Sequence, residues 1–147
     1  MGPSASSACI RACGRSSNGA IQLLNAHPRL GLVAARTLVG PQQLPDPVTL
    51  MMAHSPLPLL PDVPGPAVLG FLACSAVLRR KAFFDGGGFS KVLFCVGEEQ
   101  LLSYDLSAAG WERAYVPDVV AHHHPSARRP DPRHRRWSSV ATPCSPS

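Results

Sequence analysis

The sequence predicts an α/β fold, because strand-like and helix-like segments alternate through the middle of the chain. The clearest strand is the apolar, β-branched run at residues 31–39. The clearest helix is residues 98–109, where leucines recur at helical spacing behind two acidic residues. The chain has 147 residues, of which 45% are hydrophobic, so its length and composition suffice for one domain with a core.

The first half of the chain is expected to hold one helix, one strand and a long loop. Residues 17–27 form the helix, with Ser17 suited to the N-cap and Pro28 ending it. The strand at residues 31–39 comes next. Residues 40–66 contain eight prolines, and because proline lacks a backbone N–H, this stretch is predicted to be a loop without regular structure.

The second half begins with a predicted strand at residues 68–78, followed by a helical turn at residues 79–84. Residues 85–89, DGGGF, form a turn that needs positive φ, which glycine adopts at little cost. The helix already named follows, and two short strands at residues 113–116 and 119–121 complete the alternation.

The chain is basic, and most of the excess lies at its C-terminal end. Residues 1–126 carry nine Lys or Arg and eight Asp or Glu, whereas residues 127–147 carry five Arg and one Asp. A near-neutral body argues against a nucleic-acid-binding protein, which would present a basic face. Residues 1–16 and 127–147 lack periodicity and are predicted to be disordered, which leaves residues 17–126 as the domain. The basic tail is a candidate for peripheral contact with anionic lipid.

The cysteines indicate a reducing compartment rather than a disulfide framework. Their number is odd, no CxxC pair occurs and no secretory signal precedes them. No apolar run reaches the roughly 18 residues of a membrane-spanning helix. We therefore expect a cytoplasmic protein, with the basic tail as its one candidate for membrane association.

Glu98 and Glu99 open the predicted helix, and two interpretations apply to them. Carboxylates in the first turn are stabilised by the helix dipole, which accounts for the pair without any further function. Alternatively, one of them is a general base, because an ionised carboxylate that faces a cleft can take a proton from a sugar hydroxyl.

The triplet His122, His123 and His124 is a weaker signal for a metal site. Neighbouring side chains on an extended segment point to opposite sides, so at most two of the three share a face. A site made of histidines alone needs further ligands, and nothing in the sequence brings the other three histidines to the triplet. A surface loop is the favoured interpretation. The alternative is one histidine that completes a metal site otherwise made of carboxylates and phosphates.

Residues 70–126 carry an ordered series of short motifs. An Arg-Arg pair follows a strand, Gly-Gly-Phe stands at residues 87–89, an acidic pair opens a helix that ends in Ala-Gly-Trp at residues 109–111, and Tyr-x-Pro and a histidine come last. This series resembles the second half of the catalytic domain of family 2 glycosyltransferases, which have the type A fold. With the stretch HPRLGLVAARTLVG, the resemblance extends from Ala20 to Arg129.

The resemblance implies an inverting transfer of a sugar from a nucleotide-sugar to an acceptor hydroxyl, on a Rossmann-like fold with a mixed sheet. Glu99, the second residue of the acidic pair, corresponds to the general base, with Glu98 beside it. His122 corresponds to the histidine that helps to hold the metal or the diphosphate. The acceptor side would be lined by Gly87, Gly88, Phe89 and Trp111.

The family also implies a nucleotide-binding half that ends in an Asp-x-Asp-like motif, which holds Mg²⁺ or Mn²⁺ against the donor. At that place the chain reads SSACIRACGRSS, without an acidic residue, so we expect an N-terminally truncated transferase. The implied partners are a nucleotide-sugar, a divalent cation and a glycan or lipid-linked acceptor. The alternatives are a non-catalytic remnant that acts by binding, and a small metal- or anion-binding protein built on the histidine triplet and the basic tail.

Overall fold

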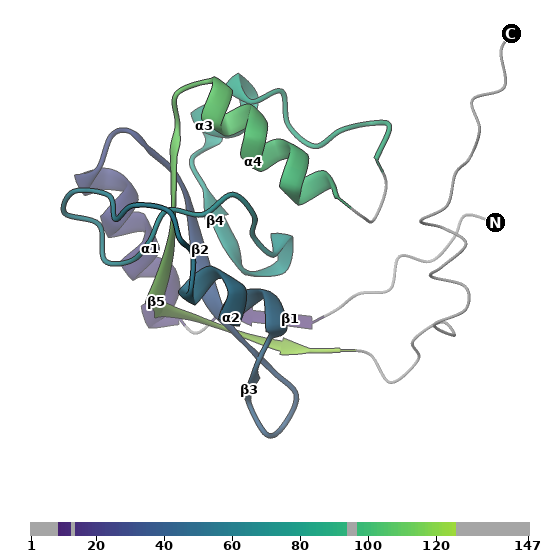
Figure 1. Cartoon of the computed structure of the whole chain (residues 1–147). Coiled ribbons are helices and arrows are strands. Elements are labelled where there is room, and N and C mark those ends of the chain that lie inside the picture. The colour runs from purple at the N-terminus through teal and green to yellow at the C-terminus, as the bar shows by residue number, and fades with distance from the viewer. Residues whose placement is uncertain (1–8, 13, 94–96, 126–147) are drawn as a thin grey trace, which may run out of the picture.

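The computed structural model of the chain describes residues 9–12, 14–93 and 97–125. It is an α/β domain with a mixed five-stranded sheet in the order β1-β5-β2-β3, in which β4 also pairs with β2 (Figure 1). The elements are β1 (Cys9–Ala12), α1 (Gly14–Ala26), β2 (Leu30–Val39), β3 (Leu44–Pro45), α2 (Pro47–Ala53), the 3-10 turn η1 (Ala73–Ser75), β4 (Ala76–Leu78), α3 (Arg80–Asp85), α4 (Glu98–Ala108) and β5 (Glu112–His124). Within these ranges, no helix combines the length and apolar character needed to cross a bilayer.

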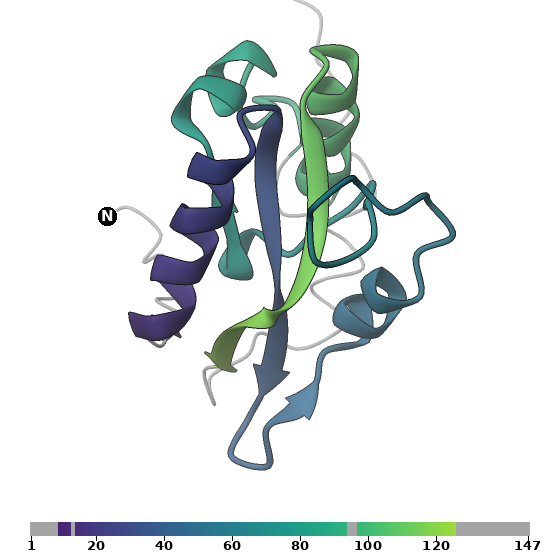
Figure 2. The ribbon, with the colours of Figure 1, turned by 90° about the vertical axis from the view of Figure 1, so that its left-hand side faces the viewer.

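The centre of the sheet is the parallel pair of β2 and β5, which lie side by side along their length (Figure 2). Their register shifts at two points, between Leu30 and Leu32 and between Ala35 and Arg36. At the second point, Ala35 is opposite Val116 and the next residue, Arg36, is opposite Val120. Pro117, which has no N–H to give to the ladder, lies in this irregularity. The two short strands expected on either side of Pro117 are therefore parts of one bulged strand.

The outer strands are all antiparallel to their neighbours: β1 pairs with the end of β5, and β3 and β4 pair with β2. Residues 66–68 also bond to β5, because Tyr115 N donates to the Pro66 carbonyl at 3.0 Å and Val68 N donates to the Arg113 carbonyl at 3.1 Å. β1 pairs only with the last residues of β5. The short segment 66–68 therefore provides hydrogen bonds for backbone groups in the first part of β5 that β1 does not reach.

The two faces of the sheet are covered by different helices, with α1 on one side and α4 on the other (Figure 1). The cluster on the α1 face consists of Ala20, Leu24, Leu30, Val33, Ala35, Val63, Ala114, Val116, Val119 and Ala121. The cluster on the other face, to which α2, α3 and α4 contribute, consists of Leu32, Ala34, Met52, Val68, Phe71, Ala82, Leu102, Leu106 and Tyr115. These buried apolar side chains supply the main driving force for folding.

The N-terminal stretch expected to be disordered contains regular structure where it is described. Residues 9–12 form β1, and α1 begins at Gly14 instead of residue 17. The other residues of the two predicted disordered ends, which are 1–8, 13 and 127–147, lie outside the described residues. The strand predicted at residues 31–39 is confirmed as β2, one residue longer.

The long loop predicted at residues 40–66 is wrong in part, because it contains β3 and α2. Asp46 is the N-cap of α2, and its carboxylate accepts a hydrogen bond from Val48 N at 2.8 Å. Pro47 occupies the first turn, where a backbone N–H is not needed. The proline count was therefore a poor guide, since a proline placed just after an Asp cap favours the start of a helix.

The strand predicted at residues 68–78 is also shorter than expected. Only β4 has strand pairing with β2, and η1 precedes it directly. The predictions for the next elements are confirmed: α3 forms the helical turn, and Gly87 and Gly88 have φ of 78° and 74°. In α4, Leu102 and Leu106 are buried as expected, whereas Ala109, predicted as the last helical residue, is the exposed C-cap.

Candidate functional site

A cavity of about 530 Å³ lies between α2, the first turn of α4 and two connecting segments, residues 55–57 and 68–72. The wall formed by α2 is fixed to the sheet at Thr49, whose Oγ1 accepts a hydrogen bond from Thr37 N of β2 at 3.0 Å. Both threonines are buried, so this bond sets where α2 lies against the sheet.

The opposite side of the cavity is held by two long side chains that donate to backbone carbonyls. The side-chain amide of Gln100, on α4, donates to the Leu69 carbonyl. The guanidinium of Arg113, on β5, donates from Nε to the Val68 carbonyl at 3.1 Å and from Nη1 to the Trp111 carbonyl at 2.6 Å. Burial lowers the pKa of Arg113, while the nearby carboxylate of Glu112 raises it. These bonds connect segment 68–72 to both α4 and β5.

The walls of the cavity are mainly apolar. Three polar side chains line it, namely Ser55, Glu99 and Gln100. Ser55 Oγ is already engaged, since it donates to the Ala67 carbonyl at 2.6 Å and accepts from Leu57 N at 3.3 Å. The apolar side chains that line the cavity are Val48, Met51, Met52, Pro56, Leu57, Val68, Leu69, Phe71 and Leu72.

Glu99 is the ionisable residue of this cavity. It sits in the first turn of α4 after Gly97, whose φ of 84° turns the chain into the helix. Among the described residues, no hydrogen bond or ion pair engages the Glu99 carboxylate, and the side chain is partly buried. Glu98, the other acidic residue of the pair, does not line the cavity. The two members of the acidic pair therefore have different environments, although they are adjacent in the sequence.

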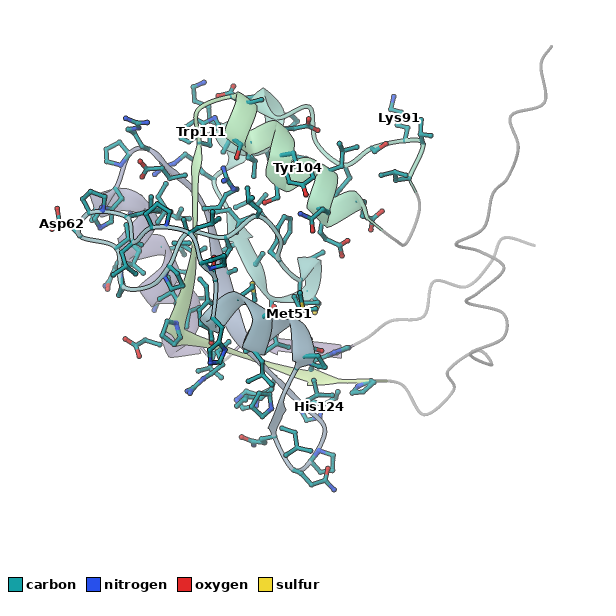
Figure 3. The ribbon with its side chains drawn as sticks, viewed as in Figure 1. Met51, Asp62, Lys91, Tyr104, Trp111 and His124 are labelled. Atoms are coloured by element: carbon teal, nitrogen blue, oxygen red, sulfur yellow. The ribbon has the colours of Figure 1, made fainter. Side chains whose placement is uncertain are left out.

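The residues predicted to line the acceptor side do not line this cavity. Trp111 follows the end of α4 that is opposite to Glu99, and an 11-residue helix is about 16 Å long. Its indole Nε1 donates to Asp85 Oδ2 at 3.0 Å, and Figure 3 shows Trp111 well away from Met51, which lines the cavity.

The glycine turn is packed against α3 instead. The Phe89 ring meets the Phe83 ring edge-on, with 5.6 Å between their centroids. A Cβ placed on Gly88 would lie 3.2 Å from the Phe83 ring, so the turn has little room beside this side chain. Gly87 and Gly88 thus shape the exit from α3, and neither of them lines the cavity beside Glu99.

The histidine triplet lies in β5, where a surface loop was the favoured expectation. His122 is opposite Arg11 of β1 and Leu38 of β2, so it belongs to the sheet and is not in a loop. Like Trp111, it does not line the cavity. Among residues 9–12, 14–93 and 97–125, no group of three or more His, Cys, Asp or Glu is arranged to hold a metal ion.

Several residues of the cavity could not be identified from the sequence alone. Met51 and Met52 were expected in a loop, although the Asp46–Pro47 pair at the start of α2 was a signal for a helix there. Cys74, which was treated as an idle thiol, does not line the cavity, but the charge of Glu99 acts on it. Burial raises the pKa of the Cys74 thiol, and the charges of Asp46 and Glu99 raise it further, so the thiol form is favoured.

No protein-family model matches the chain, and no curated protein sequence matches it.

Proposed function

We propose that the cavity beside Glu99 is the acceptor end of an inverting glycosyl-transfer site. The observation that carries this proposal is that Glu99, the residue at the general-base position of the motif series, borders the cavity with its carboxylate unengaged, whereas Glu98 does not border it. The mixed α/β sheet is compatible with the Rossmann-like fold that the resemblance implies.

In the proposed reaction, an acceptor hydroxyl enters the cavity and hydrogen-bonds to the Glu99 carboxylate. The hydroxyl oxygen attacks the anomeric carbon of the nucleotide-sugar from the face opposite the leaving group, while Glu99 takes the hydroxyl proton. The new C–O bond forms as the bond between the anomeric carbon and the diphosphate oxygen breaks, and the nucleoside diphosphate leaves with that electron pair. The configuration at the anomeric carbon is inverted.

A divalent cation would neutralise the leaving diphosphate in such enzymes. The described residues do not fit this role, because they contain no cluster of carboxylate, histidine or cysteine ligands. His122 is held in β5 between β1 and β2. We therefore derive no step through a metal, and the described residues of this chain are assigned only the acceptor side of the reaction.

The acidic pair supplies its own control for a test. The full chain is incubated with UDP-, GDP- and dTDP-sugars, Mn²⁺ and candidate acceptors, and release of the nucleoside diphosphate is measured. Glu99→Gln should reduce release by about 10²- to 10⁴-fold, as expected for loss of a general base. Glu98→Gln should stay within a few-fold of the native chain, although both variants lose a similar helix-dipole stabilisation of about 0.3–1 kcal/mol.

Two results would overturn the proposal. One is equal activity of the Glu99→Gln and Glu98→Gln variants. The other is an absence of nucleoside diphosphate release from the native chain with every donor, which would leave the non-catalytic alternative in its place. Thermal melting of each variant shows whether a loss of activity reflects unfolding.

A further inference from the structure

We infer that the cavity beside Glu99 binds an apolar acceptor, namely an alcohol whose hydroxyl is carried by an alkyl chain, and not a glycan. This inference rests on the proposed function for the role of Glu99, but the binding preference follows from the walls of the cavity alone. The volume of about 530 Å³ lies within the roughly 300–1,000 Å³ typical of small-molecule sites.

The polar groups of the cavity are too few to receive a sugar. A pyranose has several hydroxyl groups, and each one removed from water needs a hydrogen-bond partner. The Ser55 hydroxyl already bonds to the backbone at Ala67 and Leu57, and the Gln100 amide donates to Leu69. Among the described lining side chains, this leaves the Glu99 carboxylate and the remaining amide groups of Gln100 without a partner, which are too few for the several hydroxyls of a sugar but enough for an acceptor with a single hydroxyl.

The apolar walls favour an alkyl chain for the rest of the acceptor. Val68 and Phe71 belong to the buried core and form the inner wall, so a chain placed against them leaves water. Met51 lies at the outer wall on α2 and is 73% exposed, which provides an apolar surface that continues from the cavity toward solvent (Figure 3). Each buried methylene should tighten binding about fourfold.

The exposed Met51 and Leu59 form a matched pair for mutation. Their exposed fractions are 73% and 72%, but only Met51 lines the cavity. A charged residue at either position should be tolerated by the fold. Met51→Glu places a carboxylate in the path of the alkyl chain, whereas Leu59→Glu makes the same kind of change at a residue that does not line the cavity.

The test is an NMR titration of the full ¹⁵N-labelled chain with n-butanol, n-hexanol, n-octanol and methyl glucoside, without any donor. We expect saturable shifts of the Gly70, Gly97 and Gln100 amides, with affinity rising about fourfold per methylene and methyl glucoside without effect. Met51→Glu should weaken n-octanol binding at least tenfold, and Leu59→Glu should not change it.

The inference is overturned if methyl glucoside binds as well as n-octanol, if n-octanol produces no saturable shift, or if both variants bind alike. Glu99→Gln separates this inference from the proposed function. It should retain the dependence on chain length even though it loses glycosyl transfer. Alkanol binding by a chain that transfers no sugar would leave the binding preference intact and contradict only the proposed reaction.

Discussion

The indole N–H of Trp111 donates a hydrogen bond to the carboxylate of Asp85 at 3.0 Å, which ties the residue before β5 to the last residue of α3. Lys81 donates to the same carboxylate oxygen at 2.7 Å, and its ammonium lies 5.8 Å from the centre of the Trp111 ring. The three side chains thus form one contact group at the end of α4 that is opposite to the cavity.

This contact group predicts a pH dependence. The hydrogen bond from Lys81, followed by that from Trp111, lowers the pKa of Asp85 below its ordinary value of 3.8. A carboxylate with a lowered folded-state pKa stabilises the fold above the ordinary value, and this stabilisation is lost as the pH falls through the lowered value. Urea midpoints of the native chain and Asp85→Asn should therefore differ at neutral pH and converge in acid. A constant difference across this range would contradict the assignment.

Arg79 is predicted to be a stabilising cap of α1, unlike its neighbour Arg80. Its guanidinium donates from Nε to the Leu30 carbonyl at 3.2 Å, and from Nη2 to the Leu24 carbonyl and to the His27 carbonyl, the latter at 3.3 Å. Arg79→Met should lower the free energy of unfolding by about 2–3 kcal/mol, because charged hydrogen bonds to partly buried carbonyls are lost.

Arg80→Met is the control for Arg79→Met. Arg80 is exposed, and its guanidinium lies 5.5 Å from the centre of the Phe84 ring, so its removal should cost at most about 1 kcal/mol. Denaturant titration of both variants gives the comparison. Similar losses in the two variants would show that Arg79 has no special role at the end of α1.

Gly65 is predicted to tolerate no side chain. Its φ is 141°, and a Cβ at this position would lie 1.8 Å from the Tyr115 carbonyl oxygen of β5. Gly65→Ala should therefore cost at least about 3 kcal/mol, because strained φ and a backbone clash occur together. Gly19→Ala is the control, since it lies in α1 with no described atom within 4 Å of the added Cβ, and it should stabilise the chain by up to about 1 kcal/mol.

Ser103 offers a stabilising substitution. Its side chain is fully buried in α4, and within the described part of the chain its Oγ has no hydrogen-bond partner. Ser103→Ala should raise the free energy of unfolding by about 1–2 kcal/mol, because a buried unpaired hydroxyl is removed and alanine favours the helix. Ser107→Ala on the exposed face of α4 should give only the smaller propensity gain, and equal gains from the two would contradict the burial argument.

The sequence was a good guide where the signal is local. β2 follows from a run of β-branched and apolar residues, and α4 follows from the spacing of Leu102 and Leu106 behind two acidic residues. The glycine turn at Gly87 and Gly88 follows from the positive φ that few other residues adopt. In each case, a few neighbouring residues indicate the local conformation, although β2 is completed by its pairing with β3, β4 and β5.

The sequence was a poor guide where contacts between segments far apart in the sequence determine the structure. Residue 66 ends the predicted loop and residue 68 begins the predicted strand, but residues 66–68 bond to β5, which lies some 50 residues further along. Asp46 and Pro47 start a helix within a proline-rich stretch, and this helix brings Met51 and Met52 to Glu99. Glu99 lines the cavity, but the glycine turn and Trp111, which the motif series grouped with it, do not. The apolar walls could not be predicted, since their side chains come from two separate stretches, residues 48–57 and 68–72.

The parallel pairing of β2 with β5 has a consequence during synthesis. β2 leaves the ribosome early, and its partner is among the last described residues to appear, so most of the domain must be translated before the two central strands can meet. Closing so large a loop makes the pairing slow. Until then, the nascent chain exposes the apolar residues of β2, and we expect a chaperone that shields the emerging strand to improve the yield of folded protein.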